Sequence, residues 1–454
     1  MKRFATACVL LAATLPLTGC FGGGGSDKSS NASASSTASA SNPVTITAWV
    51  GWSAATHELK EFKRLVAEYD AKHPEVKVKV VGDIVDDKIT AAIRSGSVPD
   101  VVSTFTSSNV GTFCPTGAWI DLAPYIKKDH IDMDSFTKTP LYYTQYKGTR
   151  CALPLLADTF GLYYNKVMFA KAGITHPPRT MSELTADAKK LTQKNADGSL
   201  TVVGFDPASG FYDGAPNKVL RFGSLFGGKY YDAEGNSILA TDPAWAKELT
   251  WQKNLVDWYG YDKLVRFQAG LGDEFSASNA FEKGKLAMNE DGEWRVAFIK
   301  NEHPELNYAT APMPVDDAHP ELYGSGHVNG TIIGIPKGVK HPDQAWNLVK
   351  YLTTNTHFLA EFSNAIRNVP TTLASAKSSE IQPDPHFAPF LKIIANPKSN
   401  TAPITEAGAA YQQLIQSFAL KWQAGHVSDL HAGLVNLDKQ IDAQLKQAKQ
   451  GGAP

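Results

Sequence analysis

The sequence lacks a surplus of either charge. Its 44 Lys and Arg residues nearly balance its 45 Asp and Glu residues, which leaves a formal net charge of -1 at pH 7 over 454 residues. A protein that binds nucleic acid or an anionic lipid surface through its overall field needs an excess of basic groups. We therefore expect no nucleic-acid partner. The length is sufficient for two or three domains, each with a core of its own.

Recognisable catalytic motifs are also missing. The sequence has no Gly-x-Ser-x-Gly elbow, no His-Glu-x-x-His helix and no Gly-x-x-x-x-Gly-Lys-Ser/Thr phosphate loop. The stretch Gly324–Gly330 is rich in glycine, but its spacing does not fit a dinucleotide loop, so we interpret it as a turn. We predict no catalytic residue, no cofactor and no metal site. The paired carboxylates of a glycosidase are a spatial feature and stay open.

Cysteine is scarce, with four residues in the whole chain. Cys8 and Cys20 lie in the amino-terminal segment, which leaves Cys114 and Cys151 for the folded body. Neither belongs to a Cys-x-x-Cys motif or lies near a His cluster, so zinc has no support. In an exported protein these two residues are expected to form a disulfide. Two buried free thiols or a metal pair are the alternatives.

The apolar run at the amino terminus is too short to span about 30 Å of hydrocarbon. It extends from Phe4 to Leu17, follows Lys2 and Arg3, and ends in Leu17-Thr-Gly-Cys20. A basic start, a short apolar segment and small residues before a cysteine are typical of a bacterial lipoprotein signal. We predict a signal peptide with a lipobox over residues 1–20 and lipidation, such as palmitate, on Cys20.

A polar tract follows the predicted cleavage site. Residues 21–43 consist mainly of Gly, Ser, Ala, Asn and Thr, a composition that buries too little apolar surface to fold and so predicts a flexible tether. Together the two segments place the folded body at the extracellular face of the cell membrane, anchored by lipid, and a Gram-positive bacterium is the expected setting.

The folded body begins with alternating strands and helices. Val44 to Val50 alternate apolar and polar residues with the period of a strand, and the apolar residues from Leu59 to Tyr69 recur at helical spacing until His73-Pro74 ends the helix. A strand, a short helix and a further strand follow at Val76–Val80, Ile89–Ile93 and Val101-Val102. Helical crossovers join parallel strands, so this region is predicted to be an α/β layer.

A second α/β region is expected from about Asp158. It contains a short strand at Leu162–Tyr164, a capping box at Thr180-x-x-Glu183 that opens a helix through Leu191, and an Asp242-Pro243 helix start. The carboxyl end has one apolar helical stripe, which we expect to dock on the body. The stripe consists of Leu430, Leu434, Leu437, Ile441 and Leu445.

Eight short stretches beyond Ser41 match the motifs of one protein family, and they occur in the same order along the chain. They are Val44–Trp52, Ser95–Val102, Leu153–Lys166, Gly173–Thr180, Met288–Trp294, Gly326–Gly330, His341–Trp346 and Asn368–Thr371. Together they resemble landmarks of the extracellular solute-binding proteins of carbohydrate ABC importers, the maltose-binding-protein-like family 1.

The resemblance implies an α/β fold of the type II periplasmic-binding-protein kind, with two lobes joined by hinge crossovers and a ligand cleft between them. By analogy the amino-terminal lobe would hold residues 44–156 and 307–356, and the carboxyl-terminal lobe residues 157–306 and 357–454. The protein would not be an enzyme. It would act as a monomer that captures a mono- or oligosaccharide and delivers it to the transmembrane subunits of an ABC permease.

Two other functions stay open. One is a binding protein for a non-sugar solute such as a glycerophosphodiester, which would need Arg, Ser and backbone N–H donors in the cleft. The other is a secreted lipoprotein that hydrolyses glycans.

Sugar recognition combines flat aromatic faces with planar groups that bind adjacent hydroxyls. The aromatic candidates are Trp52 after the first strand, Tyr212, and Trp294 in a Gly-x-Trp motif that the resemblance marks as a stacking ring. Each has core packing as its alternative role. Trp52 would then pack on the first helix.

The polar candidates follow strand ends or hinge positions. The resemblance places an acidic ligand residue at Asp158, whose alternative role is a hinge cap. Asp83 and Asp86 follow the second strand, Ser107 follows the third, and each has a turn or loop role as its alternative. The remaining candidates are Gly326, His327 and Arg367, with a structural turn or a buried carboxylate anchor as their alternatives.

Overall fold

The computed structural model describes residues 39–213 and 217–451. The predicted signal peptide, Cys20 and the tether up to residue 38 lie outside the described residues. No helix within the described ranges is long and apolar enough to cross a membrane.

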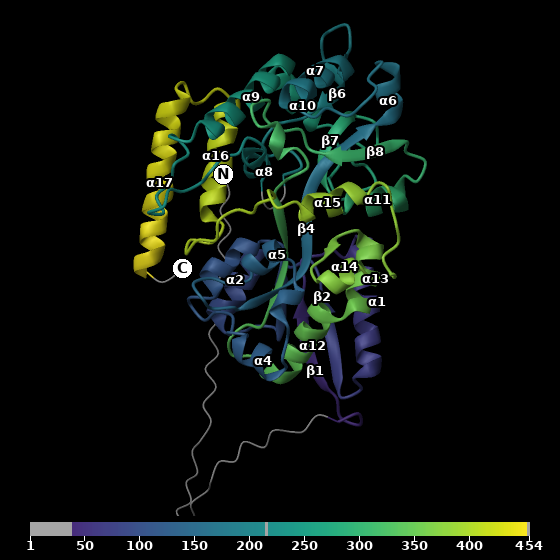
Figure 1. Ribbon diagram of the computed structural model, residues 1–454, viewed down its shortest axis with the longest axis vertical. Coiled ribbons are helices and arrows are strands. Elements are labelled where there is room, and N and C mark those ends of the chain that lie inside the picture. The colour runs from purple at the N-terminus through teal and green to yellow at the C-terminus, as the bar shows by residue number, and fades with distance from the viewer. Residues whose placement is uncertain (1–38, 214–216, 452–454) are drawn as a thin grey trace, which may run out of the picture. The chain divides into compact units, whose positions relative to one another are not determined.

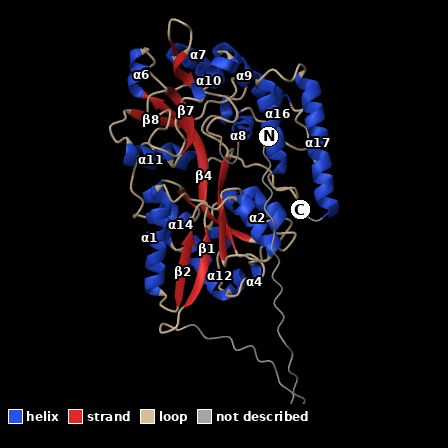
Figure 2. Ribbon diagram, turned by 180° about the vertical axis from the view of Figure 1, so that it is seen from behind, coloured by secondary structure: helices blue, strands red, loops and turns tan. Residues whose placement is uncertain are grey.

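One long strand, β4 (Ala152–Asn165), joins two half-sheets. Its first part pairs antiparallel with β9 (Val328–Gly334), from Ala152 opposite Gly334 to Thr159 opposite Val328. From Phe160 onward it pairs with β7 (Leu286–Gly292) instead. Figures 1 and 2 show β4 running through both halves of the fold. The change of partner between Thr159 and Phe160 marks the hinge between two lobes.

The strand order across both half-sheets is β2-β1-β3-β9-β4-β7-β6-β5, with β8 and β10 also paired to β4. In the amino-terminal half, β1 pairs parallel with β2 and β3. In the other half β6 pairs parallel with β7. The remaining strands are β1 (Val44–Trp49), β2 (Val76–Val81), β3 (Val101–Thr104), β5 (Gln193–Lys194), β6 (Leu200–Phe205), β8 (Tyr308–Pro312) and β10 (Val369–Pro370).

Helices cover both half-sheets (Figure 2). Those of the first part of the chain are α1 (His57–Lys72), α2 (Asp86–Ser95), α3 (Val110–Phe113), α4 (Ala123–Lys128), α5 (Lys138–Tyr142), α6 (Lys166–Lys171), α7 (Met181–Leu191), α8 (Lys218–Leu225) and α9 (Pro243–Tyr259). Those that follow are α10 (Tyr261–Gln268), α11 (Arg295–Glu302), α12 (Pro342–Thr354), α13 (Thr356–Ile366), α14 (Leu373–Ala376), α15 (Ala388–Ala395), α16 (Ala410–Gln423) and α17 (Leu430–Gly451).

The local sequence patterns formed the expected elements. α1 ends at Lys72, directly before His73-Pro74. α2 ends at Ser95 and is followed by the capping residue Gly96, which adopts a positive φ of 70° that glycine tolerates without a Cβ clash. Thr180 caps α7 by accepting a hydrogen bond from the backbone N–H of Glu183. The predicted β-α-β-α-β start and the α/β fold class are therefore confirmed.

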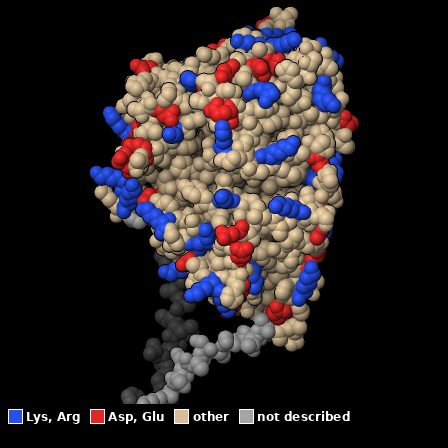
Figure 3. All heavy atoms as spheres, viewed as in Figure 1, with Lys and Arg blue, Asp and Glu red and all other residues tan. Residues whose placement is uncertain are grey.

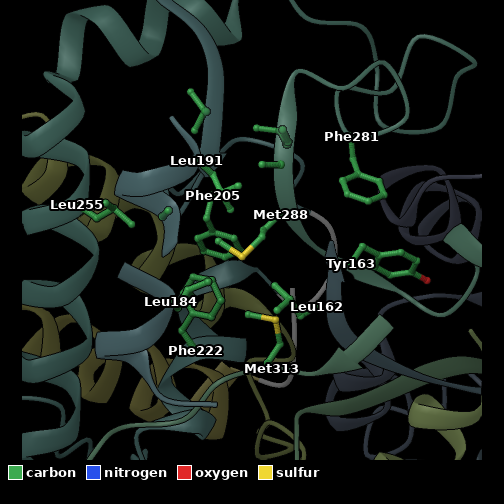
Figure 4. Packing of buried hydrophobic residues seen from close by; sticks show 14 of the residues in the cluster. Leu162, Tyr163, Leu184, Leu191, Phe205, Phe222, Leu255, Phe281, Met288 and Met313 are labelled. Carbon is green, nitrogen blue, oxygen red and sulfur yellow. The ribbon is translucent and has the colours of Figure 1, made fainter. Parts of the chain in front are cut away.

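Two apolar clusters form the cores of the lobes. The amino-lobe cluster packs β1 and β2 against α1 and α12, with Phe62 at its centre fully buried. The carboxyl-lobe cluster packs β6 and β7 against α7 and α9, and Figure 4 shows Phe205, Leu184 and Met288 meeting there. Two separate cores are the physical basis for two rigid bodies around one hinge.

The two clusters place two segments differently from the expected lobe boundaries. Tyr308, Met313 and Val315 pack in the carboxyl-lobe cluster, because β8 pairs with the second part of β4. Helix α13 instead presents Phe358 and Phe362 to the amino-lobe cluster against α1. From the sequence, segment 308–315 was expected in the amino lobe and segment 357–366 in the carboxyl lobe. The two clusters show which core each segment packs against, and the expected lobe boundaries stay a prediction.

The carboxyl-terminal helix docks on the body as predicted. Leu434, Leu437, Ile441 and Leu445 of α17 are buried in one cluster with residues of α8, α9 and α16. Figure 1 shows α16 and α17 side by side at the edge of the carboxyl lobe. This stripe therefore belongs to the core of the chain itself.

The surface carries both signs of charge. Figure 3 shows Lys and Arg side chains interspersed with Asp and Glu over the face that it presents. The balance of charges in the composition thus corresponds to a mixed distribution on this face.

Cys114 and Cys151 form a disulfide, which confirms the predicted pairing. Their Cα atoms are 5.3 Å apart and their sequence separation is 37 residues. Both are buried, and the bond ties the end of α3 to the start of β4 next to Phe113 and Trp119. It braces the base of the strand that leads to the hinge.

Replacement of both cysteines by alanine is expected to lower the free energy of unfolding. Closing a loop of this length restricts the unfolded chain, an effect worth about 2 to 4 kcal/mol. Urea unfolding of the wild type and of Cys114→Ala/Cys151→Ala measures the difference. Wild type treated with a reductant is the matched control and should lose a similar amount. Equal stability of all three samples would contradict the prediction.

Candidate functional site

A cavity of about 440 Å³ lies between the two lobes. The amino lobe contributes Trp52 and Phe105, the carboxyl lobe contributes Tyr212 and Trp294, and Asp158 of β4 lines it at the hinge. Its position at the ends of β1 and β3 is where open α/β sheets bind ligands. The full lining is Gly51, Trp52, Ser53, Thr56, Glu58, Ile84, Val85, Asp86, Thr104, Phe105, Thr106, Asp158, Phe160, Tyr212, Arg221, Glu274, Phe275, Glu290, Asp291, Trp294, Thr331 and Asn368.

Two phenylalanine rings offer the most accessible aromatic faces. Phe105 of the amino lobe is 36% exposed and Phe275 of the carboxyl lobe is 47% exposed, although large apolar side chains are usually buried. Both line the cavity. An exposed ring on each lobe provides apolar surface for a guest held between them.

Trp52 lines the cavity but belongs mainly to the core. Its side chain is only 4% exposed, and its ring packs against Phe62 of α1 at 5.0 Å and Phe362 of α13 at 5.2 Å between centroids. The alternative role, a ring packed on the first helix, therefore describes most of its surface. Only a small part of the Trp52 ring therefore faces the cavity.

Trp294 lies on the wall of the carboxyl lobe. Its ring meets Phe160 edge to face at 5.5 Å, and it covers Gly292, where an added Cβ would come within 2.2 Å of the indole. The glycine of the Gly-x-Trp motif is thus required for the ring to lie in this position. The indole Nε1 is buried and has no hydrogen-bond partner among the described residues.

Tyr212 contributes a ring but not a free hydroxyl. Its backbone has a φ of 47°, and its ring stacks on Phe211 with centroids 4.2 Å apart. The hydroxyl donates to the carbonyl of Gly272 at 2.6 Å and accepts from the N–H of Ala280 at 3.0 Å. These bonds fix the ring at the wall of the cavity.

At the hinge, two carboxyl groups from different segments share a set of hydrogen bonds. The Asn368 amide donates to both Asp158 and Glu293, the latter at 3.1 Å. The backbone N–H of Thr159 donates to Glu293 at 2.9 Å. Burial raises the pKa of Asp158 to about 6, and burial beside Asp158 raises the pKa of Glu293 well above its ordinary value. Glu293 therefore keeps a proton, and one negative charge is shared at the hinge.

Two buried arginines stiffen the wall of the carboxyl lobe. Arg221 of α8 binds Glu290 through two nitrogens at 3.1 and 3.0 Å, and its guanidinium lies 4.2 Å from the ring of Phe160. Arg295 binds Asp291 at 2.8 Å and Glu282 at 3.1 Å. Removal of one partner of such a buried pair is costly, by about 3 to 5 kcal/mol. The paired groups fix the geometry of the wall.

Five of the ten predicted ligand residues line the cavity together, namely Trp52, Asp86, Asp158, Tyr212 and Trp294. Asp86 accepts a hydrogen bond from the hydroxyl of Thr104 at 2.5 Å. The other five, Asp83, Ser107, Gly326, His327 and Arg367, lie outside the lining.

Asp83 and Ser107 take part in local structure near the cavity. Asp83 has a φ of 57° and accepts from the backbone N–H of Ala54 at 3.1 Å, as in a turn. Ser107 is buried and donates to Asn329 at 2.6 Å. Both side chains connect neighbouring segments of the amino lobe.

Gly326, His327 and Arg367 lie outside the cavity lining and bind other segments of the chain. The N–H of Gly326 donates to Ser399 at 3.1 Å, and the carbonyl of His327 accepts from Thr159 at 2.8 Å. Burial lowers the pKa of His327 to about 3, so its ring is neutral. Arg367 forms an ion pair with Asp384 at 3.4 Å, the carboxylate anchor considered from the sequence.

The sequence patterns missed much of the lining. Glu58, Arg221, Glu274, Phe105 and Phe275 had no motif around them. Glu290 and Asp291 lie in a landmark stretch, and charged residues within an otherwise apolar strand pattern could have indicated a buried polar site. No group of three or more His, Cys, Asp or Glu in the described part of the chain could hold a metal ion.

The raised pKa of Asp158 predicts a pH dependence of stability. Below about pH 4 the protonated carboxyl stabilises the fold fully, and this stability is lost as the pH rises through about 6. The shift from 3.8 to about 6 corresponds to about 3 kcal/mol. Asp158→Asn should therefore flatten the decline in unfolding free energy between pH 4 and 6, as measured by urea titration. The exposed Asp257→Asn is the control, and a wild-type slope retained in Asp158→Asn would refute the assignment.

Comparison with known proteins identifies the family. The profile of the bacterial extracellular solute-binding proteins matches residues 64–389. The maltotriose-binding protein of Pyrococcus abyssi (strain GE5 / Orsay) is 24% identical over 332 residues, which cover 72% of this chain and 67% of that protein.

Solved structures agree in fold over nearly the whole described chain. CpMnBP1 with mannotriose bound has a TM-score of 0.78 at 26% identity, covering 87% of this chain and 99% of that one. An ABC transporter solute-binding protein from Thermotoga lettingae TMO, bound with α-D-tagatose, has a TM-score of 0.74 at 22% identity and covers 88% of this chain and 100% of its own. The likeness to these structures is one of fold, and because the family profile matches well over half of the sequence, the chain belongs to the bacterial extracellular solute-binding protein family.

Proposed function

We propose that the chain is the lipid-anchored receptor of an ABC importer, which captures a mono- or oligosaccharide and passes it unaltered to a membrane permease. The cavity between the lobes carries this proposal, because each lobe places an exposed aromatic ring, Phe105 or Phe275, on its wall. A guest that contacts both lobes favours the closed arrangement about the hinge. The closed form is what the permease would recognise.

The chemistry of the cavity suits a hydroxyl-rich guest. Ring faces pack against the C–H face of a sugar, while carboxylates accept hydrogen bonds from its hydroxyl groups. The Nε1 of Trp294 and the Oδ1 of Asn368 are buried and have no hydrogen-bond partner among the described residues, although both residues line the cavity. The names of the relatives, which include maltotriose-, mannotriose- and tagatose-bound proteins, support the same class of guest.

The anchor is the second part of the proposal. Cys20 in its lipobox would carry the lipid, and the polar tract after it would tether the body to the extracellular face of the membrane. The family of extracellular binding proteins is consistent with this location. A monomeric receptor in a Gram-positive bacterium fits the arrangement, since a lipid anchor retains the protein where no periplasm does.

A phosphodiester is a less suitable guest than a neutral or cationic one. Among the described residues, six carboxyl side chains line the cavity, whereas Arg221 is the one residue with a guanidinium in the lining. Arg221 is already bound to Glu290. A phosphate placed here would meet repulsion from the surrounding carboxylates, contrary to what anion sites require.

A receptor should bind sugar without turnover. We expect a panel of mono- and oligosaccharides to include at least one that raises the melting temperature of the purified chain in a saturable manner, with no release of reducing ends over hours. Glycerophosphodiesters and amino acids in the same screen are the matched comparison. Steady turnover of an oligosaccharide would establish the hydrolase instead, and stabilisation by a non-sugar alone would establish the other cargo.

Trp294→Ala is expected to weaken binding of the sugar found in this screen by about 1 to 3 kcal/mol, because a stacking face is lost. Calorimetry measures the change. Trp258→Ala, at a tryptophan that is 37% exposed and outside the cavity lining, is the matched control and should bind as the wild type does. Unchanged affinity of a folded Trp294→Ala protein would remove this residue from the binding surface.

A further inference from the structure

Gly51 is the one glycine in the cavity lining among the described residues. It lies after the end of β1 and directly before Trp52. It is not among the glycines with a positive φ, so its φ lies outside the range that other L residues avoid. Backbone conformation therefore does not explain the absence of a side chain at this position, and the space around it has to.

The ring of Phe105 occupies that space. A Cβ atom added to Gly51 would lie 2.5, 2.9 and 3.0 Å from the Cε2, Cζ and Cδ2 atoms of Phe105, which are its three nearest neighbours. Carbon atoms that are not bonded prefer about 3.5 to 4.0 Å, so such contacts are repulsive. The far edge of the Phe105 ring thus takes the place of a side chain at position 51.

The main chain at Phe105 is held independently. Its carbonyl accepts a hydrogen bond from the Nδ2 of Asn329 in β9 at 3.0 Å. The Oδ1 of the same Asn329 accepts from the hydroxyl of Ser107 at 2.6 Å, and Asn329 is only 6% exposed. Because these bonds fix the backbone on both sides of the ring, the position of the ring depends on what its far edge contacts.

One neighbour of the Phe105 ring is also fixed. The ring of Trp52 lies edge-on to it at 5.8 Å between centroids, and Trp52 packs in turn against Phe62 and Phe362 of the amino-lobe core. Phe105 itself keeps part of its surface exposed and lines the cavity. The ring is therefore set against a rigid wall while another part of its surface is open to a guest.

We infer that Gly51 is a positioning residue of the sugar site, which by its lack of a side chain holds the Phe105 ring where a sugar contacts it. The inference rests on the proposed sugar-binding function. A side chain at position 51 would displace the far end of a partly exposed ring and no backbone atom. Contact between a ring and a sugar face falls steeply with distance, so this displacement costs affinity and little stability.

The carboxyl lobe has a comparable arrangement that is less open to substitution. Gly292 lies under the Trp294 ring, but it is buried and pairs with Phe160 of the hinge strand β4. A side chain there would disturb the strand pairing as well as the ring. The pairing of β1 ends at Trp49, before Gly51, so Gly51 is the position where the placement of a ring can be changed alone.

A double-mutant cycle tests the inference. The probe is the sugar that binds the wild type most tightly among glucose, mannose and their di- and trisaccharides, and calorimetry with the full chain measures affinity. Gly51→Ala and Phe105→Ala are each expected to bind it about tenfold more weakly. Gly51→Ala/Phe105→Ala should match Phe105→Ala to within about twofold, because no ring is left to displace.

Two controls separate ring placement from damage to the fold. Gly270 also lacks a positive φ, lies outside the lining, and would bring an added Cβ only to 3.6 Å from the carbonyl oxygen of Phe267. Gly270→Ala should therefore bind the sugar as the wild type does. The melting temperature of sugar-free Gly51→Ala should stay within about 2 °C of the wild type.

Three results would overturn the inference and leave the sugar receptor standing. They are wild-type affinity in Gly51→Ala, an equal loss from Gly51→Ala with and without the Phe105 ring, and a loss of stability in Gly51→Ala that Phe105→Ala does not restore. If no sugar binds the wild type, the proposed function fails and the inference fails with it.

Discussion

Strand β4 is the element on which the rest of the structure depends. It pairs with β9 up to Thr159 and with β7 from Phe160, so one continuous backbone belongs to both half-sheets. Each half-sheet has its own apolar core, and little apolar packing is needed across the change of partner. A hinge motion of the kind that the proposed function requires would therefore involve few residues, those around the change of partner.

The hinge is polar because three chain segments meet there without a core. Asp158 from β4, Glu293 after β7 and Asn368 before β10 share hydrogen bonds, and the raised pKa of Glu293, which favours its protonated form, limits the charge that must be buried. Such a network is directional. It fixes the relative placement of the segments more strictly than apolar contacts would, since a displaced partner leaves a buried group unsatisfied.

Rigidity of the cavity wall and access to a guest are provided by different residues. Arg221 and Arg295 are fully engaged with carboxylates and hold the backbone of the carboxyl lobe in place. Phe105 and Phe275 are left exposed on opposite lobes. A side chain that holds the wall in place is therefore distinct from one that is free to contact a ligand, and residue type alone does not tell them apart. Trp52 illustrates this, because contacts with other core residues cover most of its ring.

The sequence by itself determined what depends on neighbours along the chain. The alternation in Val44–Trp49, the helix stop at His73-Pro74 and the cap at Thr180 act over a few residues, and all formed as predicted. The ordered landmarks were sufficient for the family and the fold, and the Cys114–Cys151 pair followed from their being the cysteines left in the body.

The tertiary structure alone decided which lobe holds β8 and α13 and which side chains meet in the cavity. Glu58, Arg221 and Glu274 line the cavity although Glu58 and Glu274 are more than 200 residues apart and none of the three lies in a motif. His327 and Arg367 lie in or beside landmark stretches, but they bind other segments of the chain and do not line the cavity. The reason is physical: a binding wall is set by how two separately packed bodies face each other, and no local pattern records that geometry.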